Sequence, residues 1–220
     1  MIKATYIDHM GTDLTVANAA RVSFGKTSEM EDDPWGPPKL KKKDDKLIRY
    51  LAKHKHISPF GHCFASFHIK APVFVARQLV KHKFLRWNEI SRRYVKDAPE
   101  FYQPKLRAAA KDKKQGSGDP LILSIQQDEV IQQVHNQAVK QYRYLLQTGV
   151  CEEQARVVLP QSTMTEWYWS GSLDAFADMC KLRCASDTQY ESRLVADNIS
   201  NTMSELFPVS WDALTENADD

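Results

Sequence analysis

The chain has 220 residues, of which 42% are hydrophobic and 10% aromatic, enough for a folded domain with a sizeable core and not typical of a disordered chain. Its 30 Lys and Arg nearly balance 28 Asp and Glu, so the net charge of +2 gives the whole molecule little attraction for nucleic acid. No stretch approaches the roughly 18 apolar residues of a membrane span and no secretory signal is evident, which predicts a cytoplasmic protein with no membrane partner.

The cysteines and the domain organisation are simple. The four cysteines form neither CxxC pairs nor a regular framework, so we expect reduced, mostly buried thiols and no metal site. Cys180 and Cys184 lie four residues apart with no histidine on the same helical face, which favours core packing over metal binding. No internal repeat and no long linker divides the chain, so residues 1–220 are expected to form a single domain.

The first part of the chain alternates between strand and helix patterns. In order, these predict a strand over residues 2–11, a helix over 13–24 capped near Thr12 or Asp13, a mobile surface loop over 25–45, a helix over 46–54 and a half-buried strand over 62–72. In the second strand Cys63, Ala65, Phe67 and Ile69 alternate with more polar residues. Pro72 is expected to begin the next helix, at the position where its missing N–H costs least.

The second part of the chain is mainly helical. After an exposed loop near 107–120, the patterns predict a long helix over 122–147, a segment 151–160 that closes at Pro160, an aromatic strand over 165–170 and two helices over 173–184 and 190–206. Strands and helices are therefore mixed without a regular alternation. The expected fold class is α+β, with a β-sheet packed against several helices.

Residues 77–94 (RQLVKHKFLRWNEISRRY) hold six Lys or Arg, one His and a single acid, Glu89. The cations gather where the helix that follows Pro72 ends. A solvated helix end would explain such a charge run. Against this, the cations alternate with Gln, Asn and Ser, which can read the edge of a heterocycle. A groove that stacks single-stranded nucleic acid on Phe84, Trp87 and Tyr94 is a third interpretation, and it predicts a broader positive face.

The string KHKFLRWNEISRRY resembles the signature of the flavin-dependent thymidylate synthases. In that family an Arg-His-Arg triplet is followed, after seven residues, by Ser within an Asn-Glu-x-Ser-x-Arg-Tyr pattern. Here the triplet is Lys81-His82-Lys83 and the serine is Ser91, with Asn88, Glu89, Arg93 and Tyr94 matching in place. The segments HISPFGHCFASFHIKAPVFVARQLV, ARVVLP and KLRCASDTQYESR are similar to other family blocks, so the resemblance covers about residues 20–193 without the two charged loops.

The resemblance implies the family's fold and its reaction. A flavin-dependent thymidylate synthase converts dUMP to dTMP, with methylenetetrahydrofolate as carbon donor and a hydride from FAD that NADPH has reduced. It also implies a homotetramer with sites shared between subunits, and no cysteine nucleophile. No nucleic acid partner follows from this interpretation.

The resemblance also implies roles for individual residues. The catalytic group comprises Arg183, Ser91 and His56. The FAD-binding group comprises Ser58, Lys81, His82, Lys83, Glu89, Ser172 and Asp178. The dUMP-binding group comprises Gln78, Lys81, Glu89, Ser91, Arg93, Arg156 and Arg183. Arg183 matches the arginine that favours ionisation of the uracil N3, because a fixed cation lowers the cost of negative charge there.

Three of these roles have structural alternatives. Ser91 could be an ordinary polar residue in a loop. Arg183 could pair with Asp187 one helical turn later, a common but weak type of ion pair. His56, which precedes Ser-Pro, could simply cap a turn instead of lying near the flavin.

The sequence departs from the family on the cofactor side. Lysines replace both outer arginines of the triplet, which keeps the charge and loses the bidentate fork. Ser172 and Asp178 stand where asparagines are usual, and an ionised Asp178 would repel a phosphate. Gly61 replaces a glutamate. A catalytically lapsed homologue that binds dUMP without FAD therefore stays open beside the enzyme, as does the single-stranded nucleic-acid binding module.

Overall fold

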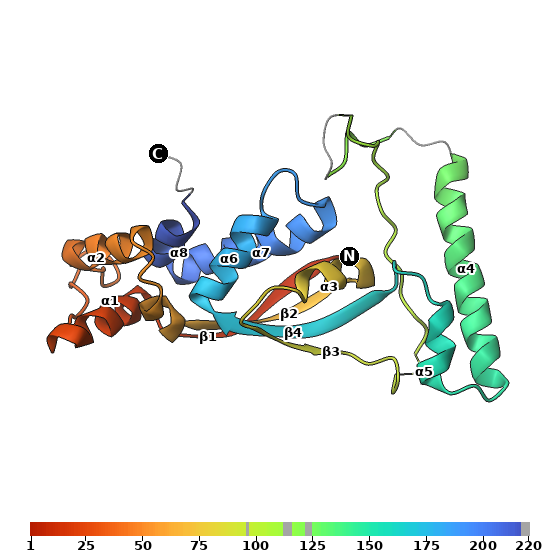
Figure 1. Cartoon of the computed structure of the whole chain (residues 1–220), viewed down its shortest axis with the longest axis horizontal. Helices are drawn as coiled ribbons and strands as arrows, with labels where there is room; N and C mark the ends of the chain where they lie inside the picture. Colours follow the sequence, from red (N-terminus) through yellow and green to blue (C-terminus); the bar gives the residue numbers. More distant parts are fainter. Residues whose placement is uncertain (96, 112–115, 122–124, 217–220) are drawn as a thin grey trace.

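An antiparallel sheet organises the protein (Figure 1). The structure is a computed structural model that describes residues 1–95, 97–111, 116–121 and 125–216. In these residues the sheet has four strands in the order β1-β2-β4-β3. The strands are β1 (Lys3–Met10), β2 (Phe64–Pro72), β3 (Leu85–Glu89) and β4 (Met164–Ser172). This architecture confirms the α+β fold class.

Helices cover one face of the sheet and extend from both of its ends (Figure 1). They are α1 (Asp13–Arg21), α2 (Lys42–Lys53), α3 (Val73–Leu79), α4 (Ile125–Gln147), α5 (Glu152–Ala155), α6 (Leu173–Arg183), α7 (Tyr190–Leu206) and α8 (Pro208–Thr215). Short 3₁₀ turns occupy Val22–Phe24, Ser58–His62 and Arg156–Val158. α3, α6 and α7 lie over the sheet, whereas α4 and α5 stand beyond the end opposite to α1, α2 and α8. None of the helices in the described residues has the length and apolar character to cross a bilayer.

The core lies between the two central strands and the covering helices. As the alternation predicts, the side chains of Ala65, Phe67 and Ile69 on β2 are at most 1% exposed. On β4, Trp167 and Trp169 reach the same degree of burial. The helices contribute a complementary apolar set, comprising Val75, Ala76, Leu79, Leu173, Phe176, Ala177, Cys180, Val195, Ala196, Ile199 and Met203. Burying this much apolar surface is the main force that holds the helices on the sheet.

Strand β3 is an element that the sequence did not predict. Its five residues pair with β4, from Leu85 opposite Gly171 to Glu89 opposite Trp167. The Trp87 ring stacks on Trp167 with centroids 4.2 Å apart. A Cβ on Gly171 would lie 2.4 Å from Leu85 Cδ2 and 3.1 Å from Phe84 O, so a larger residue here would displace the Leu85 side chain. The basic stretch is therefore partly a rigid strand.

The predicted loop over residues 25–45 is too long at its C-terminal end, because α2 begins at Lys42. Asp44 in the first turn of α2 is fully buried. Its carboxylate accepts hydrogen bonds from Arg21 and Ser28. Ser28 in turn exchanges two backbone hydrogen bonds with the Asn18 amide, at 2.7 and 2.9 Å. The N-terminal part of the loop is thus anchored to α1 and α2.

Other boundaries differ in smaller ways. Pro72 ends β2 and caps α3 instead of occupying its first helical position. The predicted long helix and the two helices after β4 are confirmed as α4, α6 and α7, although residues 122–124 lie outside the described residues. The loop near 107–120 closes on itself through a bridge between Arg107 and Pro120. Residues 112–115 of that loop also lie outside the described residues.

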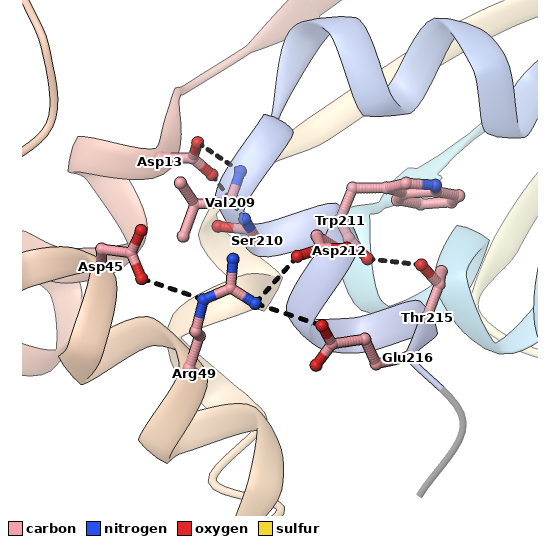
Figure 2. Close-up of polar contacts among 9 residues, drawn as sticks. All are labelled: Asp13, Asp45, Arg49, Val209, Ser210, Trp211, Asp212, Thr215 and Glu216. Atoms are coloured by element: carbon pink, nitrogen blue, oxygen red, sulfur yellow. Dashed lines mark hydrogen bonds and ion pairs between the residues drawn. The ribbon is translucent and has the colours of Figure 1, made fainter.

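Helix α8, which the sequence analysis missed, is capped by a residue from the opposite end of the chain (Figure 2). The Asp13 carboxylate accepts hydrogen bonds from the backbone N–H of Val209 and of Ser210, both at 2.9 Å. Asp13 is only 7% exposed. A negative charge at a helix N-terminus satisfies free N–H groups and complements the helix dipole. In contrast, Arg49 meets Asp212 of α8 at 2.8 Å in an exposed ion pair.

We predict that Asp13→Ala lowers the free energy of unfolding by about 2 kcal/mol, because the N–H groups of Val209 and Ser210 lose their acceptor. The matched change Asp212→Ala should cost under about 1 kcal/mol, since exposed ion pairs contribute little. Urea denaturation of both variants measures the difference. Equal losses would contradict the capping role of Asp13.

Candidate active site

The cations of residues 77–94 meet at the turn between α3 and β3. Lys81, His82 and Lys83 occupy this turn, and Phe84 closes it with a left-handed φ of 63°. Both lysines are exposed, and in the part of the chain that the structure describes neither forms an ion pair with a carboxylate. Positive charge therefore accumulates here without a counter-charge, which favours an anionic ligand.

A cavity of about 520 Å³ opens beside this turn. Its lining comprises Phe74, Arg77, Gln78, Lys81, Gln161 and Gln189. The Gln78 amide is held from two sides: its nitrogen donates to Gln189 Oε1, and its oxygen accepts from Ser192 Oγ at 2.9 Å. Of the lining residues, the sequence analysis had singled out Gln78 and Lys81. Gln189 was missed, although it lies in the block TQYESR that carried part of the resemblance.

A second cavity of about 290 Å³ shares Gln161 with the first. Its wall includes Glu89 and Arg156, two further residues from the sequence analysis. The Glu89 carboxylate accepts a hydrogen bond from Thr165 Oγ1 at 2.6 Å, which fixes it at the end of β3. The structure thus brings Gln78, Lys81, Glu89 and Arg156 to two adjoining cavities. These residues come from three separate segments of the chain.

Ser91 and Arg93 lie together in the turn that follows β3. The backbone N–H and the Nε of Arg93 both point at Ser91 Oγ, at 3.3 and 3.4 Å. The Arg93 guanidinium lies over the Tyr94 ring, 5.2 Å from its centre. Neither residue lines the two cavities described above, whereas the neighbouring Arg92 lines the second. The structure therefore places these two residues beside the cavities and not in them.

Arg183 reaches the basic turn from the end of α6. Its Nε donates a hydrogen bond to His82 Nε2 at 2.9 Å. Burial, together with the Arg183 charge, lowers the pKa of His82 to about 4, so the ring is neutral at physiological pH. The alternative pairing of Arg183 with Asp187 is absent from the described residues. Within the residues that the structure describes, this partly buried guanidinium bonds a neutral ring and no carboxylate, which is the arrangement expected beside an anionic ligand.

The remaining flavin candidates lie near the end of the sheet where β3 begins. Ser58 starts the turn Ser58–His62, and the next residue, Cys63, accepts a hydrogen bond from the N–H of Leu173 at 2.9 Å. That bond places the turn next to Ser172, the last residue of β4. Glu89, at the other end of β3, is farther along the sheet. Within one chain the FAD candidates Ser58 and Ser172 therefore lie at one end of β3, and Glu89 lies at the other.

The structure gives less support to the roles of His56 and Asp178 near the flavin. The His56 backbone N–H bonds Leu51 O at 2.8 Å, where it closes the end of α2. Its ring lies 6.2 Å from that of Tyr50. Asp178 is exposed on α6. An exposed carboxylate does not suit a phosphate, whereas the unpaired charges of Lys81 and Lys83 fit the diphosphate of FAD.

The structure also bears on the alternative chemistries. No group of three or more His, Cys, Asp or Glu in the described residues could hold a metal ion. Cys180 is buried in the core, as expected. Burial, with a contribution from Asp13, raises the pKa of Cys63 to about 11, so it is a poor nucleophile at neutral pH. Trp87 is stacked within the sheet and is not free to form a groove for nucleic-acid bases.

Comparison with known proteins confirms the resemblance. Residues 5–209 match the family described as thymidylate synthase complementing protein. A flavin-dependent thymidylate synthase of Thermus thermophilus is 39% identical over 211 residues, which cover 96% of this chain and 74% of that protein. One from Thermotoga neapolitana is 37% identical over 212 residues, covering 96% and 90%.

A solved structure shows the same fold. The UMP/dUMP methylase PolB from Streptomyces cacaoi, bound with 5-Br dUMP, superposes with a TM-score of 0.84. It is 30% identical in sequence, and the match covers 98% of this chain and 95% of that one. From sequence and structure together, the chain belongs to the family of flavin-dependent thymidylate synthases.

Proposed function

We propose that the protein methylates C5 of dUMP to give dTMP, with methylenetetrahydrofolate as carbon donor, FAD as cofactor and NADPH as reductant. The observation that carries this proposal is the set of unpaired cations around the cavity of Gln78 and Lys81, in a chain of this family. Both dUMP and FAD are anionic. Clustered counter-charges can therefore hold the two ligands next to each other.

For dUMP we propose a site built on the two adjoining cavities. Gln78 offers its amide to the uracil edge, and Lys81 and Arg156 supply positive charge for the phosphate. Glu89, fixed by Thr165, can accept a hydrogen bond from the sugar or the base. Ser91 and Arg93 complete the site from the adjacent turn.

For FAD we propose the end of the sheet where β3 begins. Lys81 and Lys83 are exposed cations that suit its diphosphate, while Ser58 and Ser172 can donate hydrogen bonds. His82 and His56 would lie near the flavin ring, with Glu89 at the boundary with dUMP. When bound and reduced, FAD supplies the hydride of the reaction. Asp178 does not fit this role, and we assign it none.

The proposed role of Arg183 follows from its unpaired charge. A guanidinium beside the uracil imide lowers the cost of negative charge at N3. That charge delocalises to C5, which becomes a better carbon nucleophile. No enzyme thiol has to attack C6, in keeping with the absence of cysteine from both cavity walls.

We further propose a homotetramer in which neighbouring copies complete each site. Its support is the placement of Ser58 and Ser172 toward one end of the sheet and of Glu89 toward the other. On α4, Val130 and Val134 are 59% and 52% exposed, an apolar surface that a second copy could cover. We also propose a cytoplasmic location for the enzyme.

The proposal predicts that purified protein, loaded with FAD, keeps its flavin absorption bands after desalting. With dUMP, methylenetetrahydrofolate and NADPH it should then form dTMP, which chromatography detects. UMP is the matched competitor, because the Streptomyces cacaoi neighbour is described as a UMP/dUMP methylase. A colourless protein that binds dUMP and never FAD would instead indicate a lapsed homologue. Salt-sensitive binding of oligonucleotides without flavin would favour a nucleic-acid module.

A second prediction concerns Arg183→Ala. Loss of the cation beside the imide should reduce dTMP formation by about 100-fold or more, as for other groups that stabilise developing charge. Bound FAD should be retained. Arg143→Ala is the control, since Arg143 carries the same charge at an exposed position of α4 and belongs to neither proposed ligand site. Undiminished turnover in Arg183→Ala would end the proposed role.

A third prediction concerns the pH dependence caused by His82. Its folded-state pKa of about 4 lies below the ordinary value of 6.5, so the unfolded chain takes up the proton first as pH falls. The protein should therefore lose stability between about pH 6.5 and pH 4, and keep the full contribution of neutral His82 above that window. NMR titration of the His82 ring measures the pKa, and Arg183→Ala should move it upward. An unshifted titration near 6.5 in the unaltered protein would contradict this assignment.

A further inference from the structure

A chain of hydrogen bonds links the first cavity to a buried ion pair outside it. The Gln78 nitrogen donates to Gln189 Oε1, and Gln189 Nε2 donates to Glu191 Oε2 at 3.4 Å. Glu191 is only 3% exposed, and Arg107 Nη2 bonds both of its oxygens at 3.0 Å. An amide in the cavity wall is thus connected to an ion pair through one intermediate side chain.

Several contacts hold the ion pair of Arg107 and Glu191, at the far end of these hydrogen bonds. Arg107 Nε donates to Ser117 Oγ at 2.6 Å, and its guanidinium lies over the Tyr190 ring, 4.7 Å from the centre. Tyr102 also hydrogen-bonds Glu191, and burial together with the Glu191 charge raises the pKa of Tyr102 to about 12. Its hydroxyl therefore keeps its proton and acts as a donor. Each of these three neighbours, Arg107, Tyr102 and Gln189, gives Glu191 a hydrogen bond.

The direction of the hydrogen bonds follows from the chemistry of Glu191. A carboxylate can only accept. Gln189 must therefore turn its NH₂ group toward Glu191 and its oxygen toward Gln78. Gln78 must then turn its own NH₂ group toward Gln189. The hydroxyl of Ser192 can donate or accept, so it follows the orientation of Gln78 and does not set it.

This direction matters because the two ends of a glutamine amide have nearly the same shape. Flipping the amide exchanges a donor for an acceptor. Uracil carries an accepting oxygen at C4, in either ionisation state of the ring, whereas cytosine carries a donating amino group there. An amide that is free to flip could suit both bases. One that is fixed with an N–H toward C4 suits uracil alone, since the NH₂ of Gln78 keeps a second hydrogen for the ligand.

We propose that Glu191 is a positioning residue which, through Gln189, fixes the amide of Gln78 and so makes the site select uracil over cytosine nucleotides. This inference rests on the proposed function, because it requires a pyrimidine nucleotide in the first cavity. Specificity is then determined by a carboxylate that does not line the cavity itself. A cytosine nucleotide would bind more weakly, because its donating amino group would face the N–H of Gln78 instead of an acceptor.

The test measures dissociation constants of dUMP and dCMP for the FAD-loaded protein by calorimetry. The unaltered protein should prefer dUMP. In Glu191→Gln the side chain at 191 can offer either an oxygen or an NH₂ group, so the preference should fall by about tenfold, the effect of one mispaired buried group. Arg107→Lys is the matched control, since it keeps a cation beside Glu191 and keeps Glu191 an acceptor. Its preference should be unchanged.

A double variant tests the direction of the hydrogen bonds themselves. In Gln189→Glu with Glu191→Gln, the carboxylate moves to position 189, where it accepts from Gln78. The amide at 191 can donate to that carboxylate and accept from Arg107. The preference for dUMP should therefore return. The moved charge can change the affinity for both nucleotides. This change cancels in the ratio of the dissociation constants of dCMP and dUMP, because both nucleotides carry the same phosphate.

The outcomes separate the two proposals. An unaltered protein that binds neither nucleotide would overturn the proposed function and this inference with it. A protein that prefers dUMP and keeps that preference in folded Glu191→Gln would overturn the inference alone, as would a double variant without recovery. If Glu191→Gln does not fold, Gln189→Leu breaks the same chain without touching the ion pair. The same tenfold fall is then expected, and its absence would overturn the inference.

Discussion

Mutual repulsion of like charges is the constraint on which the candidate site depends. The turn between α3 and β3 keeps Lys81 and Lys83 close together with no carboxylate partner in the described residues, and Arg183 reaches the same turn through His82. Packing holds this arrangement in place. Trp87 stacks on Trp167, and Gly171 lets Leu85 approach β4 closely. The apolar interior thus stabilises a surface whose electrostatic energy an anionic ligand would lower.

The neutrality of His82 makes this arrangement possible. A protonated ring between two lysines would add a third positive charge and would lose its ability to accept from Arg183. Burial and the Arg183 charge prevent that protonation at physiological pH. The histidine therefore orients the guanidinium without competing with it for an anion. Charge and hydrogen bonding at the turn act together in this way.

Sequence reasoning predicted the parts of the fold that depend on local pattern. The alternation in β2 and the helical spacing in α7 are visible in the chain itself. β3 was missed because the alternation in its five residues (LRWNE) includes only two apolar positions, and the segment becomes a strand only beside β4. α8 was missed because its cap, Asp13, lies almost two hundred positions earlier in the chain. Gln189 was missed for the same reason, since its contact with Gln78 spans 111 positions.

The contact between Asp13 and α8 has a consequence for how the chain acquires its structure during synthesis. The acceptor emerges from the ribosome almost two hundred residues before the N–H groups that it binds. Until then the buried carboxylate of Asp13 lacks these partners, and α1 cannot complete its final packing. This end of the molecule can therefore close only after Val209 and Ser210 have been made, when the sheet and most of the helices are already synthesised.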